Sequence, residues 1–250
     1  MNRQHRLSLY RMAGPGLIGA LSALSACAQQ DPSTPAKTVA PVYTTDQISG
    51  LFYMQKYWIA TRNLEKAVWY FAPDGVAYYN PQTGFAAEDL AAVASSKKGP
   101  YSVSGGRMTV QWGDGQKSDD EIKIVDGGFN WNTGMYLPVA PFESAAELVG
   151  SYEGGSSVSF SGNSTIIVKS LTLNADGTFS LEGASSLTNG DTRTGGQSAT
   201  QGKWSLSGYA LALTDDAGKV VRGITFPLDD AATPSKPDRM FFAGVSYAKK

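Results

Sequence analysis

The chain has 250 residues but only one histidine and one cysteine, so few sets of side chains could perform catalysis. His5 and Cys27 both lie in or at the edge of an apolar N-terminal segment that looks like an export signal. Removal of residues 1–26 would leave 224 of the 250 residues, with no histidine and with Cys27 at the new N-terminus. Such a chain can form no Ser-His-Asp triad, no Cys-His pair, no His-ligated zinc site and no internal disulfide. We therefore expect no metal and no cofactor, and we favour a protein that is not an enzyme.

Three other motifs contain residue types that could do chemistry, and each has a simpler interpretation. Residues 95–98 (SSKK) have the Ser-x-x-Lys spacing of a nucleophile pair, which needs a buried lysine at a helix start. Here two adjacent lysines end an Ala-rich segment, which is typical of a solvated helix end. Residues 119–121 (DDE) cannot place three acids on one face of a strand and predict a charged loop or a guarded sheet edge. Residues 215–218 (DDAG) and 229–230 (DD) lack the alternating oxygen ligands of a calcium loop and predict turns.

Aromatic side chains are unevenly distributed and offer the best candidates for a binding site. Residues 50–80 hold nine aromatic residues, whereas the corresponding span 150–181 in the second half holds three. Adjacent aromatic residues on a strand point to opposite faces, so some of the nine must lie outside the core or at a rim. Tyrosine and tryptophan at a rim suit a small apolar ligand, a sugar or a protein surface, while core packing is the alternative. The candidate ligand-binding residues are Tyr57, Trp58, Trp69, Tyr78 and Tyr79.

Charge and composition exclude one class of partner and favour one class of fold. The chain has 21 Lys and Arg against 22 Asp and Glu, and its largest basic clusters are the pairs 97–98 and 249–250. Proteins that bind a phosphate backbone need a clustered positive face, so we expect no nucleic-acid partner. The 28 glycines, the abundant aromatic residues and the lack of long helical patterns predict an all-β protein.

The N-terminus predicts export. Residues 1–11 are basic, and residues 12–24 are an apolar stretch of 13 residues, too short to cross a bilayer comfortably. This stretch ends in Leu24-Ser25-Ala26-Cys27, which resembles the lipobox of bacterial lipoproteins. The resemblance implies a signal peptide over residues 1–26 and a diacylglyceryl group on the thiol of Cys27, followed by cleavage and acylation of the new amine. An ordinary secretory signal with an incidental cysteine is the alternative.

The residues after Cys27 predict where the lipid would hold the protein. In lipoproteins, an aspartate directly after the cysteine tends to retain the protein at the inner membrane. The residue here is Ala28, which favours the outer membrane of a Gram-negative cell. Residues 27–46, with three prolines and small polar residues, predict a disordered tether. The membrane is therefore an expected partner, reached through the lipid on Cys27.

An internal repeat organises the rest of the chain. Three landmarks recur at offsets of 100, 102 and 103 residues, and a weaker fourth at 110: 48–52 with 148–152, 69–75 with 171–177, 99–105 with 202–208, and 131–134 with 241–244. Several collinear matches favour duplication, although any β-meander repeats glycine turns. Apolar residues alternate with period two in both halves, and consecutive hairpins with one buried face close most simply into up-and-down barrels.

The second half contains Gly-x-Tyr at residues 150–152, LTLNADGTF at residues 171–179 and GKWSLSGYALAL at residues 202–213. This pattern, over residues 148–226, resembles the small lipocalin-like barrel domains of bacterial envelope proteins. The fold that we predict is all-β: two tandem small antiparallel meander barrels, residues 47–143 and 144–250, with one short helix inserted in the first. The helix is expected within residues 85–93, and the corresponding segment 183–202, rich in Gly, Ser and Thr, is expected to be a mobile loop. A single barrel shared by both halves is the alternative.

Together these patterns predict a lipid-anchored cell-envelope protein that acts as a non-catalytic binding or assembly module. Two alternatives stay open at this point. One is a structural spacer without a pocket. The other is a histidine-independent enzyme that uses carboxylate or tyrosine side chains inside a barrel.

Overall fold

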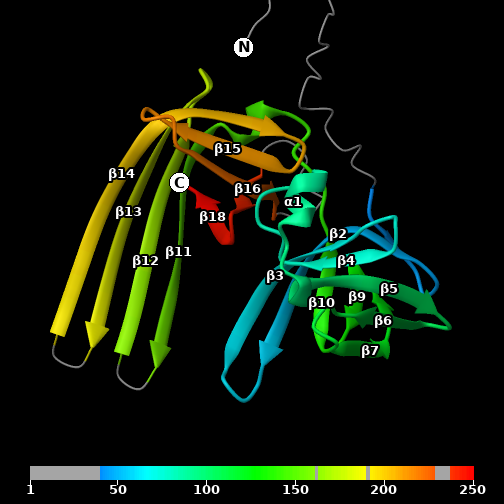
Figure 1. Cartoon of the computed structure of the whole chain (residues 1–250). Coiled ribbons are helices and arrows are strands. Elements are labelled where there is room, and N and C mark those ends of the chain that lie inside the picture. The colour runs from blue at the N-terminus through cyan, green and yellow to red at the C-terminus, as the bar shows by residue number, and fades with distance from the viewer. Residues whose placement is uncertain (1–39, 161–162, 190–191, 229–236) are drawn as a thin grey trace, which may run out of the picture. The chain divides into compact units, whose positions relative to one another are not determined.

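The computed structural model describes residues 40–160, 163–189, 192–228 and 237–250, all of which belong to one compact unit (Figure 1). The predicted signal peptide, Cys27 and most of the predicted tether lie outside the described residues, as does the pair Asp229-Asp230. The described part of the chain contains no helix long and apolar enough to cross a bilayer.

The first half of the chain forms a ten-stranded antiparallel sheet. Its order is β7-β6-β5-β4-β3-β2-β10-β9-β8, with β1 paired to β2. The two ends of this order, β7 and β8, are consecutive in the chain and separated only by Ile122, so the sheet curls into a barrel, called here the first barrel. The strands are β1 Val42–Tyr43, β2 Ile48–Trp58, β3 Asn63–Phe71, β4 Val76–Tyr79, β5 Lys98–Ser104, β6 Arg107–Gln111, β7 Lys117–Glu121, β8 Lys123–Val125, β9 Gly128–Trp131 and β10 Gly134–Pro138.

The second half forms a closed barrel of eight strands in sequential order, β11 to β18, called here the second barrel. The strands are β11 Gly150–Phe160, β12 Asn163–Leu173, β13 Thr178–Asn189, β14 Thr192–Ser207, β15 Ala210–Asp215, β16 Val220–Pro227, β17 Arg239–Phe242 and β18 Val245–Lys249. Closure comes from β18, which pairs with β11 at Tyr152, Glu153 and Gly154. The predicted pair of tandem barrels is therefore confirmed, and a single shared barrel is wrong.

Helical structure is confined to short segments. The predicted helix is α1, Ala87–Ala91, which lies between β4 and β5 inside the expected span of residues 85–93. Two single-turn 3₁₀ helices, Ser95–Lys97 and Ala145–Leu148, precede β5 and β11. The first barrel is thus the one that carries the helical insertion, as the sequence predicts.

The repeat also appears in the hydrogen bonds of the two barrels. The amide of Tyr101 donates to the carbonyl oxygen of Gly75, and the amide of Trp204 donates to that of Gly177, each at 2.8 Å. These pairs lie at offsets of 102 and 103 residues, as the sequence landmarks predict. The fourth landmark is displaced by one residue. Within this landmark the residues with positive φ are Asn132 and Thr133 in the first half and Ala243 and Gly244 in the second. They correspond at an offset of 111 residues rather than 110.

Two segments differ from their sequence-based predictions. The described residues of this span, 183–189 and 192–202, are not a loop: they belong to β13 and β14, which pair from Thr178 opposite Lys203 to Asn189 opposite Thr192. Figure 1 shows β11 to β14 as the longest strands of the second barrel. The prediction was wrong because the backbones of Gly, Ser and Thr can form the hydrogen bonds of a strand ladder, so a composition rich in these residues does not distinguish a strand from a loop. Within the predicted tether, Val42–Tyr43 instead form β1, paired with Ile48 and Ser49 of β2.

Three apolar clusters stabilise this unit. The core of the first barrel includes the tryptophans Trp69 and Trp131 with Phe52 and Phe71, whereas that of the second combines leucines such as Leu171 with aromatic residues such as Tyr152. A third cluster draws on strands of both barrels, and the Tyr209 hydroxyl in it donates a hydrogen bond of 2.7 Å to the carbonyl oxygen of Val139. The aromatic excess of the first half is therefore largely a core, which leaves the question of which aromatic residues lie at a rim.

Candidate ligand-binding site

A cavity of about 240 Å³ lies in the first barrel above its aromatic core. Five aromatic side chains line it: Trp58, Trp69, Tyr79, Trp112 and Tyr136. They come from β2, β3, β4, β10 and the segment after β6, so the cavity depends on the curvature that brings these parts of the sheet together. The chain folds this way locally because inward positions alternate with outward ones along each strand.

Strand alternation divides the predicted binding residues into two groups. Trp58, Trp69 and Tyr79 line the cavity. Tyr57 lies on the outer face with 57% of its surface exposed, and Tyr78 stacks on Tyr70 outside the barrel, with ring centroids 6.0 Å apart. The structure therefore brings three of the five predicted residues together and places the other two away from the cavity.

Glu65 is the cavity residue that the sequence did not reveal. Its carboxylate accepts a hydrogen bond from Trp58 Nε1 and another from the Tyr79 hydroxyl, each of 2.6 Å. Burial raises the pKa of Tyr79, and the hydrogen bond to Glu65 raises it further. Tyr79 therefore stays protonated as a donor, and Glu65 is a fixed acceptor facing the cavity. The sequence did contain a signal for this position. Glu65 lies two residues before Ala67 and four before Trp69, and residues spaced by two along a strand share one face, which here is the inward face.

Trp69 differs from the other tryptophans of the first barrel. It is 5% exposed, and its indole nitrogen is buried without a hydrogen-bond partner among the described residues. In contrast, Trp58 donates to Glu65, Trp112 donates to Ser118 Oγ at 2.9 Å, and Trp131 donates to the Met108 carbonyl oxygen at 3.0 Å. An unpaired buried donor costs about 1–3 kcal/mol. An acceptor bound in the cavity would satisfy it.

Two lysines occupy the positions where a cationic ligand could meet the aromatic rings. Lys56 Nζ lies 4.3 Å from the centroid of the Trp58 ring and donates to the carbonyl oxygen of Asn132 at 3.1 Å. Lys97 Nζ lies 5.8 Å from the centroid of the Tyr79 ring. A second cation at either ring would be repelled, so these contacts disfavour a cationic ligand.

The serine-lysine motif has a structural role in the described chain. Lys98 Nζ donates to the carbonyl oxygens of Leu90 and Ala91, at 3.2 and 2.9 Å, beyond the end of α1. A lysine in this position satisfies carbonyl groups that the short helix leaves unpaired. Residues 95–97 form an exposed 3₁₀ turn, so the prediction of a solvated end of a helical segment is confirmed.

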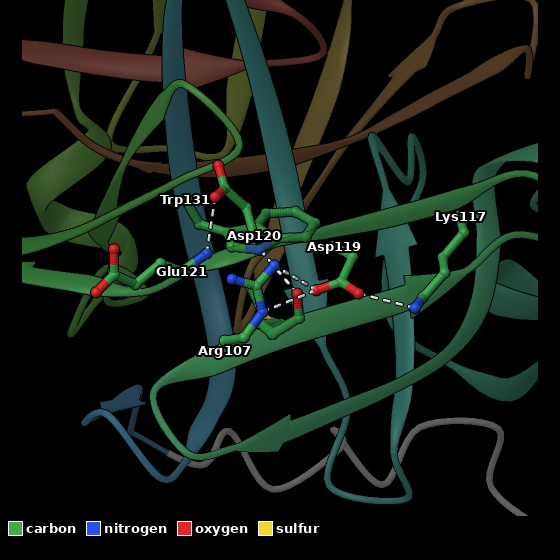
Figure 2. Close-up of polar contacts among 7 residues, drawn as sticks. Arg107, Lys117, Asp119, Asp120, Glu121 and Trp131 are labelled. Carbon is green, nitrogen blue, oxygen red and sulfur yellow. Dashed lines mark hydrogen bonds and ion pairs between the residues drawn. The ribbon is translucent and has the colours of Figure 1, made fainter.

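The acidic run at residues 119–121 forms part of a charged sheet surface (Figure 2). Asp119 accepts hydrogen bonds from Lys117 Nζ at 2.8 Å and from Arg107 Nη2 at 3.0 Å. These hydrogen bonds hold the pKa of Asp119 below its usual value. The Asp120 carboxylate instead accepts the amide of Glu121 at 2.8 Å. The three acids therefore do not converge on one site, as the strand geometry predicted.

The described residues contain no group of three or more His, Cys, Asp or Glu side chains that could hold a metal ion. At residues 215–218, Asp215 Oδ1 accepts the amides of Ala217 and Lys219, at 3.0 and 2.8 Å, which is the hydrogen bonding of a turn. The predicted turn at these residues is confirmed.

The second barrel offers no equivalent aromatic cavity among its described residues. A hollow of about 620 Å³ lies along β12, β13 and β14, where Val168, Ser170 and Glu182 line it. Val168 and Ser170 alternate with the buried Leu171, so this hollow lies on the outer face of the strands.

Comparison of the chain with protein-family models, with curated proteins and with solved structures finds no match.

Proposed function

We propose that this chain is a lipid-anchored cell-envelope protein whose first barrel binds a small neutral saccharide in the cavity lined by Trp58, Trp69 and Tyr79. The observation that carries the proposal is that two residues lining the same cavity are Trp69, whose indole N–H is buried without a partner among the described residues, and Glu65, whose carboxylate is a fixed acceptor. This cavity therefore offers a donor and an acceptor beside aromatic rings.

A saccharide fits this combination better than the other ligands that the aromatic residues suggest. Its ring has an apolar face for stacking on Trp or Tyr, and each hydroxyl both donates and accepts hydrogen bonds. An acyl chain would give the Trp69 N–H no acceptor and would take water from the Glu65 carboxylate without adding a hydrogen bond to it, which is unfavourable. Lys56 and Lys97 already occupy the cation positions at the rings.

A binding role is also better supported than a catalytic one. Glu65, the carboxylate set between aromatic residues of the cavity, is held by two donors from Trp58 and Tyr79. A general base needs a lone pair directed at a substrate proton and an acid partner within reach. The second acid that lines the cavity, Asp114, accepts the amide of Gln116 at 3.0 Å, which is the hydrogen bonding of a turn. The geometry of Glu65 instead suits an acceptor that orients a ligand hydroxyl.

The envelope location rests on residues 24–28 and the tether that follows them. Two or more acyl chains on Cys27 would anchor the protein stably, and Ala28 favours the outer membrane. Expression in a bacterium with the lipoprotein pathway and mass spectrometry of the mature product test this part. Cys27→Ser should abolish acylation and processing, and an unchanged mature product would refute the anchor.

Calorimetric titration of the purified protein with a panel of neutral monosaccharides and N-acetylated amino sugars tests the cavity. Trp58→Ala should weaken the binding of any sugar that binds by about tenfold or more, equivalent to about 1.4 kcal/mol. Tyr57→Ala is the matched control, because Tyr57 is the next residue but lies on the outer face. Equal affinities of the two variants, or no binding across the panel, would contradict the proposal.

A further inference from the structure

The turn between β2 and β3 exposes an unusual group of large apolar side chains. Tyr57, Trp58, Ile59 and Leu64 are 57%, 45%, 83% and 44% exposed, and they fall within eight consecutive residues. Figure 1 shows this hairpin extending away from β4 and β10. The pairing agrees, because β10 reaches β2 only as far as Gln55, whereas β2 and β3 pair with each other up to Trp58 opposite Asn63. We call residues 57–64 the hairpin tip.

Charge at the hairpin tip is positive. Arg62 in the turn and Lys66 beside it on β3 are both exposed. No carboxylate of the described residues lies within ion-pair distance of either side chain. The nearest acid in sequence, Glu65, faces the cavity and is held by Trp58 and Tyr79. The hairpin tip thus combines unpaired cations with apolar and amphipathic side chains.

We propose that the hairpin tip docks into the interfacial region of a bilayer that contains anionic lipids. Tyrosine and tryptophan favour the membrane interface, Ile59 and Leu64 can enter the acyl boundary, and Arg62 and Lys66 match acidic headgroups. Beyond Gln55 the hairpin is a two-stranded ribbon whose outer backbone groups have no neighbouring strand, so it suits the hydrated interfacial region and not the hydrocarbon core.

A membrane suits this shape better than a second protein does. Stable protein interfaces bury roughly 800 Å² on each partner, over about 20–30 residues. The tip is a narrow two-stranded projection of eight residues and does not offer such a surface. The inference does not rest on the saccharide site, because Ile59, Arg62 and Leu64 of the tip do not line the cavity, although Trp58 belongs to both. It goes beyond the anchor because it concerns a second contact with the membrane.

A fluorescent probe at the tip provides the test. In a full-length Cys27→Ser chain, Ile59→Cys supplies a single thiol for an environment-sensitive nitrobenzoxadiazole label. Val220→Cys is the matched control, because Val220 is 51% exposed but lies on β16 of the second barrel. Vesicles of three parts phosphatidylcholine to one part phosphatidylglycerol should shift the emission of the label at residue 59 to the blue and raise it severalfold. The label at residue 220 should not respond.

The control also separates the tip from the N-terminal segment, which could bring the whole chain to the vesicles by itself. If the two labels respond equally, or if the label at residue 59 does not respond, the proposal is overturned. The charge component is tested by Arg62→Gln and Lys66→Gln in the labelled chain. These substitutions should reduce the response several-fold, and an equal response on pure phosphatidylcholine vesicles would refute recognition of anionic lipid.

Discussion

Trp58 Nε1 donates a hydrogen bond of 2.6 Å to the Glu65 carboxylate across the β2–β3 ladder. The two residues lie on the inward face of neighbouring strands, with Lys56 directly opposite Glu65 in the register. Because Tyr79 donates to the other carboxylate oxygen at 2.6 Å, Glu65 joins β2, β3 and β4 at the cavity. The orientation of Trp58, half-exposed above the cavity, therefore depends on the charge of one side chain.

The first prediction concerns that charge. Glu65→Gln keeps the shape of the side chain but removes the anion to which both donors bind, and charged hydrogen bonds contribute about 1.5–3 kcal/mol each. We expect saccharide affinity to fall by about tenfold or more, as measured by calorimetry. Glu88→Gln, at an exposed position of α1, should leave the affinity unchanged. Equal losses in both variants would show that general charge, not this site, is responsible.

The second prediction concerns the indole N–H of Trp69, which is unpaired among the described residues, and Trp131 serves as the control. Both are buried, but Trp131 donates to Met108 whereas Trp69 has no acceptor among the described residues. Trp131→Phe leaves the Met108 carbonyl oxygen without this donor, while Trp69→Phe removes a donor that is already unsatisfied. The free energy of unfolding in urea should therefore fall by about 1–3 kcal/mol more for Trp131→Phe than for Trp69→Phe.

The same Trp69→Phe variant links stability to binding. If the N–H of Trp69 serves a ligand, its removal should weaken saccharide binding although it spares the fold. Equal destabilisation by the two substitutions would mean that the Trp69 N–H has a partner in the unliganded protein, and the main support for the proposed cavity function would then be lost.

Period-two patterns were sufficient to predict the two barrels, because each strand buries one face and the Asp-Gly turns at Gly75 and Gly177 mark the hairpins. They were insufficient for segments without large apolar residues. β13 and β14 include residues 183–189 and 192–202, where small polar side chains carry no periodic signal. The pairing itself, rather than side-chain burial, makes that segment a sheet.

The candidate site was only half predictable for a related reason. The sequence shows that Tyr57 and Trp58 must face opposite sides, as must Tyr78 and Tyr79, but not which residue of each pair faces inward. That choice depends on the register with neighbouring strands, where Trp69 lies opposite Phe52 and Tyr79. Glu65 escaped notice because a single acid in a strand is usually solvated.

The third prediction tests the duplication through two equivalent glycines. A Cβ added to Gly99 would collide with the carbonyl oxygen of Gln111, and one added to Gly202 with that of Thr214. Because backbone atoms cannot move aside cheaply, Gly99→Ala and Gly202→Ala should each destabilise the protein by about 2 kcal/mol or more in urea. Gly196→Ala is the control, since its Cβ would meet only Ser185 Oγ, at 3.5 Å. Tolerance of alanine at either site would contradict the close approach.

The last prediction concerns alkaline pH. Burial raises the pKa of Tyr247 to about 12, and burial together with the charge of Asp238 raises that of Tyr152 to about 12, from an ordinary value of 10.0. The folded state holds these protons more tightly than the unfolded chain does. Their contribution to stability is therefore complete below pH 10 and is lost as the pH rises from about 10 to about 12.

Urea unfolding measured across this range should show the free energy of unfolding declining with pH. Tyr247→Phe should flatten the decline, because phenylalanine cannot titrate, whereas Tyr57→Phe on the exposed hairpin tip should leave it unchanged. A decline of the same slope in all three proteins would mean that the buried hydroxyl of Tyr247 does not couple folding to pH.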